Sequence, residues 1–251
     1  MDLLEWDARS YDALPLPHKR WGPQAIARLR LTGTETVADL GCGTGRDAAQ
    51  LLQALPRGRV LAIDGSRQML AQLRRRLAAD LDRVQIVQAD VREPLPALPK
   101  VDAVLSVATL HWLPDHGQVF RSVAGLLRPG GQFVAEAGGA GNIAAIRAAL
   151  ASMGLDDGAA IWNFADVPET TARLAEAGFT GIEVRLVADP ARLDSPTQLE
   201  SFLATVILGA QLRDLPADQR RPFVSAVAGR LAEPVADYVR LQISATRAAD
   251  G

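Results

Sequence analysis

The stretch Val37-Ala-Asp-Leu-Gly-Cys-Gly-Thr-Gly45 decides how this sequence is interpreted. An apolar run ends at Leu40, and glycines at alternate positions, Gly41, Gly43 and Gly45, lead into a helical pattern. Glycine adopts left-handed backbone conformations and lets a backbone approach a ligand closely. The stretch therefore predicts a strand, a ligand-binding turn and a helix, with a plain Gly-rich turn as the simplest alternative.

Two features argue against a dinucleotide in this turn. A dinucleotide-binding turn has the spacing G-x-G-x-x-G, but Arg46 stands where its third glycine would be. Asp39, at the end of the predicted strand, would repel a pyrophosphate, which prefers bare backbone N–H groups. A carboxylate at this position suits a ligand that carries an ammonium or sulfonium group.

The sequence around the turn alternates between short apolar runs and helical patterns. This alternation predicts right-handed crossovers and a doubly wound α/β fold, with helices on both faces of a parallel sheet. The expected strands are residues 36–40, 59–63, 84–87, 101–107, 131–136, 182–187 and 238–244. The expected helices are residues 45–55, 66–79, 115–127, 143–153, 167–177, 196–210 and 217–231. Residues 3–31 predict two short helices punctuated by Pro15, Pro17 and Pro23.

Composition excludes several classes of protein. The chain has 251 residues and a net charge of −2, which argues against a nucleic-acid partner because no global positive field exists. Its single cysteine, Cys42, excludes an internal disulfide framework, and the three histidines lack the spacing of metal ligands. No apolar stretch reaches about 18 residues and no secretory signal begins the sequence, so we expect a cytoplasmic protein without membrane segments or bound metal.

Four motifs in order resemble the class I S-adenosylmethionine-dependent methyltransferases. They are residues 39–45, Asp64 in the segment 62–66, residues 88–91 and residues 127–133. The resemblance covers residues 32–137 and implies a Rossmann-like sheet, mostly parallel with its last strand antiparallel, together with a helical lid or insertion. It also implies that S-adenosylmethionine is the cofactor.

The same resemblance suggests a division of the chain. Residues 1–31 would form an N-terminal helical lid segment, and residues 32–189 with 235–247 the cofactor-binding core. Residues 190–234 would form a helical insertion over the active site.

The resemblance also implies a set of cofactor-binding residues. In the family, the acid at the Asp64 position binds both ribose hydroxyls, and Asp90 with the Val91 amide would bind the adenine. Met69 would lie against the adenine ring. The alternatives are a solvated strand end for Asp64, a plain turn for Asp90 and Val91, and a place in the core for Met69. The full set is Asp39, Gly41, Cys42, Gly43, Asp64, Gly65, Met69, Asp90, Val91 and Val107.

Residues 106–115 follow the fourth predicted strand, where ligands of open α/β sheets bind. Their continuation to His116 is similar to the trans-aconitate and malonyl-carrier type methyltransferases, which implies a small-molecule carboxylate acceptor. A carboxylate is ionised at neutral pH and needs no base, whereas a hydroxyl or amine needs one, for which His111 is the candidate. Candidate substrate and lid residues are Trp6, Tyr11, His18, Lys19, Arg20, His111, Trp112, Trp162 and Arg213.

Three functions are therefore open at this point. The first is methylation of a small acid to a methyl ester, and the second is O- or N-methylation of a hydroxylated or amine metabolite with His111 as base. The third is a module that binds the cofactor without catalysis. The sequence leaves the choice between a monomer and a dimer open.

Overall fold

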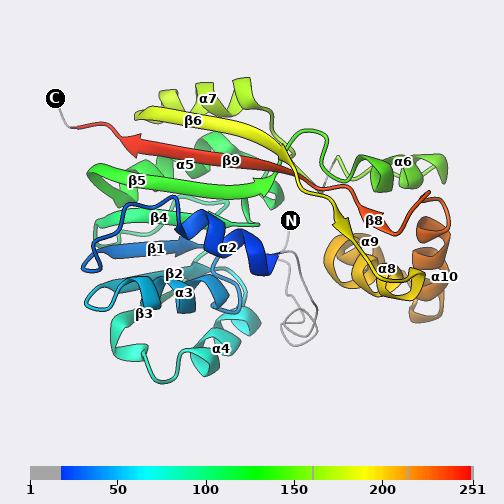
Figure 1. Ribbon diagram of the computed structural model, residues 1–251, viewed down its shortest axis with the longest axis horizontal. Coiled ribbons are helices and arrows are strands. Elements are labelled where there is room, and N and C mark those ends of the chain that lie inside the picture. Colours follow the sequence, from blue (N-terminus) through cyan, green and yellow to red (C-terminus); the bar gives the residue numbers. More distant parts are fainter. Residues whose placement is uncertain (1–17, 160, 214, 250–251) are drawn as a thin grey trace.

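The computed structural model describes residues 18–159, 161–213 and 215–249 of the chain (Figure 1). Within these ranges, no helix is both long enough and apolar enough to cross a membrane.

A seven-stranded sheet forms the centre of the molecule (Figure 1). Its strands, in spatial order, are β3 (Val84–Gln88), β2 (Arg59–Asp64), β1 (Thr36–Leu40), β4 (Val101–Val107), β5 (Leu127–Gly138), β9 (Val239–Arg247) and β6 (Phe179–Ala188). β1 pairs in parallel with β2 and β4, whereas β9 is antiparallel to both of its neighbours. The predicted doubly wound α/β sheet with an antiparallel last strand is confirmed, and its order reverses between β1 and β4, where such sheets bind ligands.

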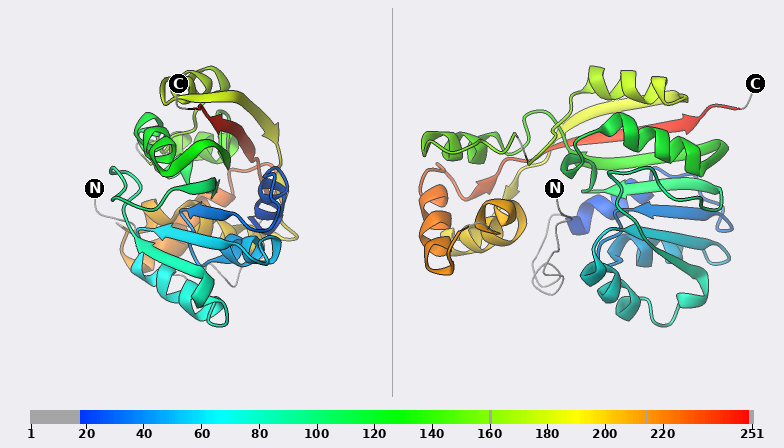
Figure 2. Two further views of the ribbon diagram at one scale, coloured as in Figure 1. Left: turned by 90° about the vertical axis from the view of Figure 1, so that its left-hand side faces the viewer. Right: turned by 180° about the vertical axis from the view of Figure 1, so that it is seen from behind.

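Helices cover both faces of the sheet (Figure 2). On one face lie α2 (His18–Ile26), α3 (Arg46–Ala54) and α4 (Arg67–Arg76), and on the other lie α5 (His116–Leu126) and α7 (Val167–Glu176). Neighbouring residues of β1 serve opposite faces, because Val37 packs with the first group of helices and Ala38 with the second. Strands buried on both faces need no polar alternation, which explains their continuous apolar character.

Local sequence accounts for where these helices begin. The side chains of Ser66, Asp115 and Asp166 accept backbone N–H groups at the starts of α4, α5 and α7. One expectation about a break is wrong: Pro23 lies inside α2 and does not end it. Packing overrides the local preference here, because Trp21 and Ala25 on either side of Pro23 are fully buried.

A second group of helices lies beyond the carboxyl ends of the parallel strands, at the right of Figure 1. It consists of α6 (Ala144–Ser152), α8 (Pro196–Phe202), α9 (Gly209–Arg213) and α10 (Ala217–Ala228). The short strands β7 (Ala191–Arg192) and β8 (Val235–Ala236) pair where residues 193–234 leave and rejoin the rest of the chain. This arrangement is compatible with a helical insertion at 190–234, and the proposed division into domains stays a prediction.

The continuous helix expected over residues 196–210 is wrong. After α8, residues Leu203–Ile207 form a π-helical turn, and α9 begins only at Gly209. π-helical turns are uncommon and often lie at functional sites. Here the turn contributes Val206 and Ile207 to the cavity described below.

Candidate functional site

A cavity of about 260 Å³ opens at the carboxyl ends of the parallel strands, between the sheet and the second group of helices. Gly43, Asp64 and Asp90 line the part beside β1, β2 and β3, which we call the cofactor end. His111, Trp112, Trp162, Arg213 and Arg240 line the part beside β4, β9 and α9, which we call the acceptor end.

Most of the residues proposed from the sequence line this cavity, but some do not. Those that line it are Gly41, Gly43, Asp64, Gly65, Met69, Asp90, Val91, Val107, His111, Trp112, Trp162 and Arg213. Asp39 and Cys42 are buried behind the glycine turn. Arg20 pairs with Asp189 instead of lining the cavity. Trp6 and Tyr11 lie outside the described residues, and so do the side chains of His18 and Lys19.

The three glycines of the turn serve three different purposes. All have left-handed backbone conformations, with φ between 50° and 79°. A β-carbon on Gly41 would lie 2.1 Å from Thr109 Oγ1, and one on Gly45 would lie 2.7 Å from Leu73 Cγ of α4. A β-carbon on Gly43 would meet nothing within 4 Å. Gly41 and Gly45 therefore allow close packing within the protein, whereas Gly43 leaves its space to a ligand.

Asp64 connects the end of β2 to the glycine turn. One carboxylate oxygen accepts the Gly43 amide at 2.9 Å, and the other accepts the Ser66 amide at 2.8 Å. A carboxylate oxygen can accept more than one hydrogen bond, so Asp64 keeps acceptor capacity toward the cavity that it lines. This is the arrangement that a pair of ligand hydroxyls requires.

Asp90 is held by its neighbour Arg92, which the sequence reasoning missed. The Arg92 Nε atom donates to both Asp90 oxygens at 3.0 Å, and Nη2 donates to Oδ2 at 2.6 Å. This hydrogen-bonded guanidinium lowers the pKa of Asp90, so the carboxylate is ionised at neutral pH. Arg92 thereby fixes the orientation of Asp90 at the cavity wall, and a D-x-R pattern after a strand is the signal that could have revealed it.

Behind the glycine turn lies a group of buried acids. Asp39 is 1% exposed, and burial together with the nearby carboxylates of Asp47 and Asp64 raises its pKa well above the usual range. Burial also raises the pKa of Asp47 to about 6. Burial and the same carboxylates raise the pKa of the Cys42 thiol, which therefore stays protonated and is a poor nucleophile. Of these acids, Asp64 is the one that lines the cavity, and its carboxylate attracts a positively charged group there.

The ring of His111 is oriented by the main chain. Its Nδ1 atom accepts the Gly138 amide at 3.3 Å, and its ring lies against Phe164 with centroids 6.0 Å apart. Since Nδ1 is the acceptor, the proton of the neutral ring is on Nε2. With this tautomer, Nε2 of the neutral ring is a hydrogen-bond donor.

Aromatic side chains build one wall of the acceptor end. Trp162 stacks on Phe164 with a centroid distance of 5.9 Å and an interplanar angle of 13°, and its ring lies 6.4 Å from that of Trp112. Gly158 makes this position possible, because a β-carbon there would lie 2.1 Å from the Trp162 ring. These rings exclude water from the place where an acceptor would bind, which strengthens the electrostatic interactions there.

Two residues of the cavity lining other than glycine have a strained backbone conformation. Ala108 has a φ of 58° and Ile143 a φ of 49°, values that residues other than glycine rarely adopt. Both residues line the cavity. Backbone strain of this kind costs about 1–3 kcal/mol and concentrates at functional sites.

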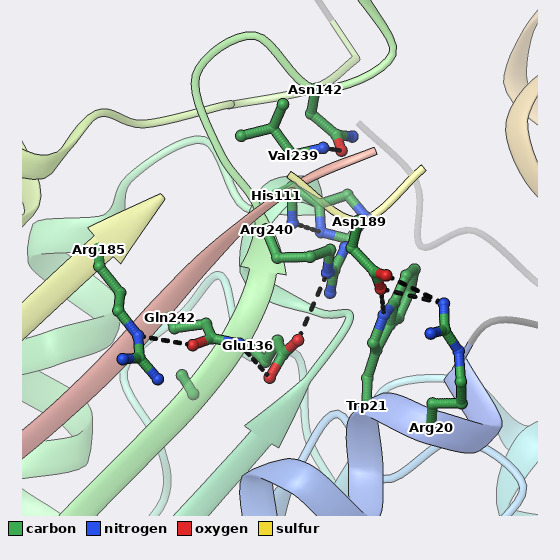
Figure 3. Close-up of polar contacts among 12 residues, drawn as sticks. Arg20, Trp21, His111, Glu136, Asn142, Arg185, Asp189, Val239, Arg240 and Gln242 are labelled. Atoms are coloured by element: carbon green, nitrogen blue, oxygen red, sulfur yellow. Dashed lines mark hydrogen bonds and ion pairs between the residues drawn. The ribbon is translucent and has the colours of Figure 1, made fainter. Parts of the chain in front are cut away.

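Arg240 is the most important residue that the sequence reasoning missed. It lies on β9, is only 1% exposed and lines the cavity, and its guanidinium group stands 3.6 Å from the centre of the Trp21 ring. Its Nε atom is 3.8 Å from Glu136 Oε1 (Figure 3). An arginine within the apolar run 238–244 is unusual, and that was the available signal.

The residues at the cofactor end fit S-adenosylmethionine. Gly43 leaves open space, and Asp64 has acceptor capacity for hydroxyls and a carboxylate that suits a cationic sulfonium nearby. In the described part of the chain, no three His, Cys, Asp or Glu side chains are grouped as metal ligands.

Comparison with known proteins finds sequence similarity to methyltransferases. Residues 37–131 match the family model of a methyltransferase domain. The trans-aconitate 2-methyltransferase of Azoarcus sp. is 37% identical over 126 residues, which are 50% of this chain and 48% of the relative. The enzyme of that name from Escherichia coli strain K12 is 37% identical over 131 residues, 51% and 49% of the two chains. The chain thus matches about half the length of these curated relatives.

Solved structures are similar over most of the chain. The YcgJ protein of Bacillus subtilis has a TM-score of 0.67 at 15% identity, and the match covers 93% of this chain and 100% of that one. The phosphoethanolamine N-methyltransferase 2 of Haemonchus contortus, bound to S-adenosyl-L-methionine, has a TM-score of 0.63 at 18% identity, covering 91% and 52%. These structural likenesses show the fold of the chain. The family model identifies residues 37–131 by their sequence. Residues 37–131 of the chain therefore belong to a methyltransferase domain, and the likeness to solved structures shows that the chain has a methyltransferase fold.

Proposed function

We propose that this protein transfers a methyl group from S-adenosylmethionine to a carboxylate of a small organic acid, forming a methyl ester. The observation that supports it is the separation of charge along one cavity. In the described ranges, the carboxylates that line the cavity are Asp64 and Asp90, both at the cofactor end, where Arg92 also lines the cavity and is paired with Asp90. Arg213 and Arg240 line the acceptor end together with His111, so an anionic acceptor meets positive charge there.

The residues of the cofactor end divide the binding of the cofactor among them. Asp64 would accept the ribose hydroxyls, Asp90 would bind the adenine edge, and Gly43 leaves room for the methionine part. When bound, S-adenosylmethionine supplies a methyl group on a sulfonium centre, and the sulfur keeps the bonding electrons as the acceptor oxygen takes the methyl.

At the acceptor end, the chain positions the nucleophile and keeps water away. A carboxylate is already ionised at neutral pH, so no proton has to be removed. His111 would donate its Nε2–H to the acceptor and hold it, while the rings of Trp112 and Trp162 exclude water. Holding the reacting groups together in a dry site is a sufficient source of catalysis for such a displacement.

The main alternative is methylation of a hydroxyl or an amine with His111 as base. This role needs an unprotonated ring nitrogen directed at the acceptor. The hydrogen bond from the Gly138 amide occupies the lone pair of Nδ1, which favours the carboxylate acceptor.

The test begins with calorimetry, which should detect binding of S-adenosylmethionine and of its demethylated product; absence of both would refute the proposal. The full chain is then incubated with cofactor that carries a labelled methyl group and with panels of organic acids, phenols and amines. A methyl ester releases its label as methanol in mild alkali, whereas N-methyl and ether products keep it. Label that resists alkali would refute ester formation.

His111 separates the two acceptor classes. The variant His111→Gln keeps a side-chain N–H donor but cannot act as a base, and His111→Ala removes both functions. We expect His111→Gln to keep kcat within about threefold of wild type and His111→Ala to lose about tenfold, the range of one hydrogen bond. A loss of about 100-fold or more in His111→Gln would support base catalysis instead.

A further inference from the structure

Arg240 carries a positive charge at a depth in the fold where charged side chains are rare. Arg240 is almost completely buried, yet it lines the acceptor end of the cavity. Burial of a charged group is unfavourable unless opposite charge or hydrogen bonds compensate for it. The groups around Arg240 therefore indicate how its charge is compensated and what it can bind.

Among the described residues, Trp21 and Glu136 hold the Arg240 guanidinium in position (Figure 3). The indole of Trp21, on α2, lies 3.6 Å from it, and this contact between a cation and an aromatic face is favourable without neutralising the charge. Glu136 lies on the neighbouring strand β5, with Oε1 3.8 Å from Arg240 Nε. That distance is an ion pair but is longer than a hydrogen bond.

Glu136 does not serve Arg240 alone. Its other oxygen, Oε2, accepts from Arg28 at 3.3 Å and from Gln242 at 3.4 Å. One buried carboxylate thus faces two guanidinium groups, and burial raises its pKa.

The wider network has the same imbalance. Gln242 also accepts from Arg185, and Asp189 accepts from Arg20 and from the Trp21 indole. Among the described residues, the network of Figure 3, extended by Arg28, joins four guanidinium groups to the carboxylates of Glu136 and Asp189. Of these four guanidinium groups, the one that lines the cavity is Arg240, so a ligand at the acceptor end meets its positive charge.

We propose that Arg240 binds an anionic group of the acceptor other than the carboxylate that is methylated, so that the acceptor carries at least two negative groups. Trp21 and Glu136 are positioning residues that hold the guanidinium in place. The proposal rests on the proposed function, because it assigns a part of the same acceptor site. A guanidinium group binds a carboxylate through two parallel hydrogen bonds, which gives orientation as well as affinity.

The test compares aliphatic dicarboxylates with their monoamides, in which a carboxamide replaces one carboxylate at nearly equal size. Wild-type protein should prefer the diacid in kcat/KM by about 10–150-fold, the range of a hydrogen bond to a charged group. In Arg240→Met this preference should fall to near one, mainly through a higher KM for the diacid, while the KM for the cofactor stays unchanged.

Two controls separate binding from folding. Arg185→Met alters the same network at a residue that does not line the cavity, and it should keep the preference. In Arg240→Met, Glu136 keeps its ion pair with Arg28, so the variant should fold, which its circular dichroism spectrum and its cofactor affinity check. The double variant Arg240→Met with Glu136→Gln removes both charges of the ion pair and should also lack the preference. Trp21→Leu should weaken the preference, and Trp21→Phe should restore most of it because the ring is retained.

The outcomes are distinct. If wild-type protein methylates the acids and both Arg240→Met and the double variant keep the charge preference, the assignment of Arg240 is wrong and the proposed function stands. A wild-type protein that methylates monoamides as well as diacids also contradicts the assignment. If wild-type protein binds the cofactor but methylates no acid, the proposed function fails, and the assignment of Arg240 fails with it.

Discussion

The two ends of the cavity are built in different ways. The cofactor end consists of short segments that follow β1, β2 and β3, and its main contacts join neighbours in the fold, such as Asp64 with the Gly43 and Ser66 amides. The acceptor end combines His111, Trp162, Arg213 and Arg240, which come from four separate parts of the chain. Its key contact joins Trp21 of α2 to Arg240 of β9, near opposite ends of the described chain.

The difference shows how one fold can keep its cofactor while its acceptor changes. Strand-turn-helix geometry dictates the residue types at the cofactor end, because glycine and carboxylate are needed at defined positions. The acceptor end is a surface between layers, where substitutions alter shape and charge without disturbing the sheet. Variants at the cofactor end should therefore affect stability or cofactor affinity, and variants at the acceptor end should affect the acceptor alone.

The largest effect is expected for Gly41→Ala. The new β-carbon would lie 2.1 Å from Thr109 Oγ1 at a residue with a φ of 74°, so strain and overpacking add. We expect the free energy of unfolding in urea to fall by about 2–4 kcal/mol. Gly43→Ala, which has open space around it, should lose about 1–2 kcal/mol from backbone strain and mainly weaken cofactor binding. Equal losses of stability in the two variants would contradict the role given to Thr109.

The next effect is the loss of cofactor affinity in Asp64→Ala. Removal of a carboxylate that accepts hydrogen bonds from bound hydroxyls should weaken binding by about 1.5–3 kcal/mol in calorimetry. A circular dichroism spectrum like that of wild type would show that the loss of the Gly43 and Ser66 contacts has not unfolded the variant. Wild-type affinity in a folded Asp64→Ala variant would refute the role in ribose binding.

At the acceptor end, Gly158→Ala should displace the Trp162 ring. Its β-carbon would lie 2.1 Å from that ring at a φ of 90°. We expect the KM for the acceptor to rise about tenfold, which corresponds to about 1.4 kcal/mol, with unchanged cofactor affinity. Gly154→Ala is the matched control, because Gly154 also has a positive φ but nothing lies near its added β-carbon. A weakened cofactor affinity in Gly158→Ala would mean that the two ends are not independent.

The smallest effect concerns the buried acids behind the glycine turn. The folded pKa of Asp47 is about 6, above its unfolded value, so the folded state binds more protons between about pH 4 and pH 6. Stability from this group is therefore present below about pH 4 and is lost as the pH rises through about 6. Asp47→Asn should raise the free energy of unfolding at pH 8 by about 1 kcal/mol, because the variant buries no charged carboxylate. This gain is smaller than the pKa shift of Asp47 corresponds to, because the polar amide of the asparagine is still buried.

Its pH profile provides the check. Unfolding curves at pH 4 and pH 8 should differ less for Asp47→Asn than for wild type. Glu233→Gln changes an exposed carboxylate, which pairs with Arg192 at the surface, and should leave both values within about 0.5 kcal/mol. A profile for Asp47→Asn that is identical to wild type would show that the Asp47 carboxylate is not the source of the pH dependence.

Most of the sheet could be predicted from the sequence because its signals are local. β1 and β4 begin and end at the predicted residues, and the predicted helix starts near Ser66, Asp115 and Asp166 agree with the observed caps. The break of the predicted helix 196–210 was missed because the π-helical turn depends on how that segment packs over the cavity. Pro23 within α2 was misjudged for the same kind of reason, since burial of Trp21 outweighs the local penalty.

The sequence by itself determined the fold class and the cofactor end, because a glycine turn between a strand and a helix, and acids at strand ends, have one common structural solution. The sequence also proposed His111, Trp112, Trp162 and Arg213 at the acceptor end, but the tertiary structure alone decided the contacts there. It placed Arg240 against Trp21 and Glu136, set the hydrogen bond that defines the His111 tautomer, and moved Arg20 away from the cavity to Asp189. The physical reason is that these contacts join residues far apart in the chain, and only the packing of layers brings such residues together.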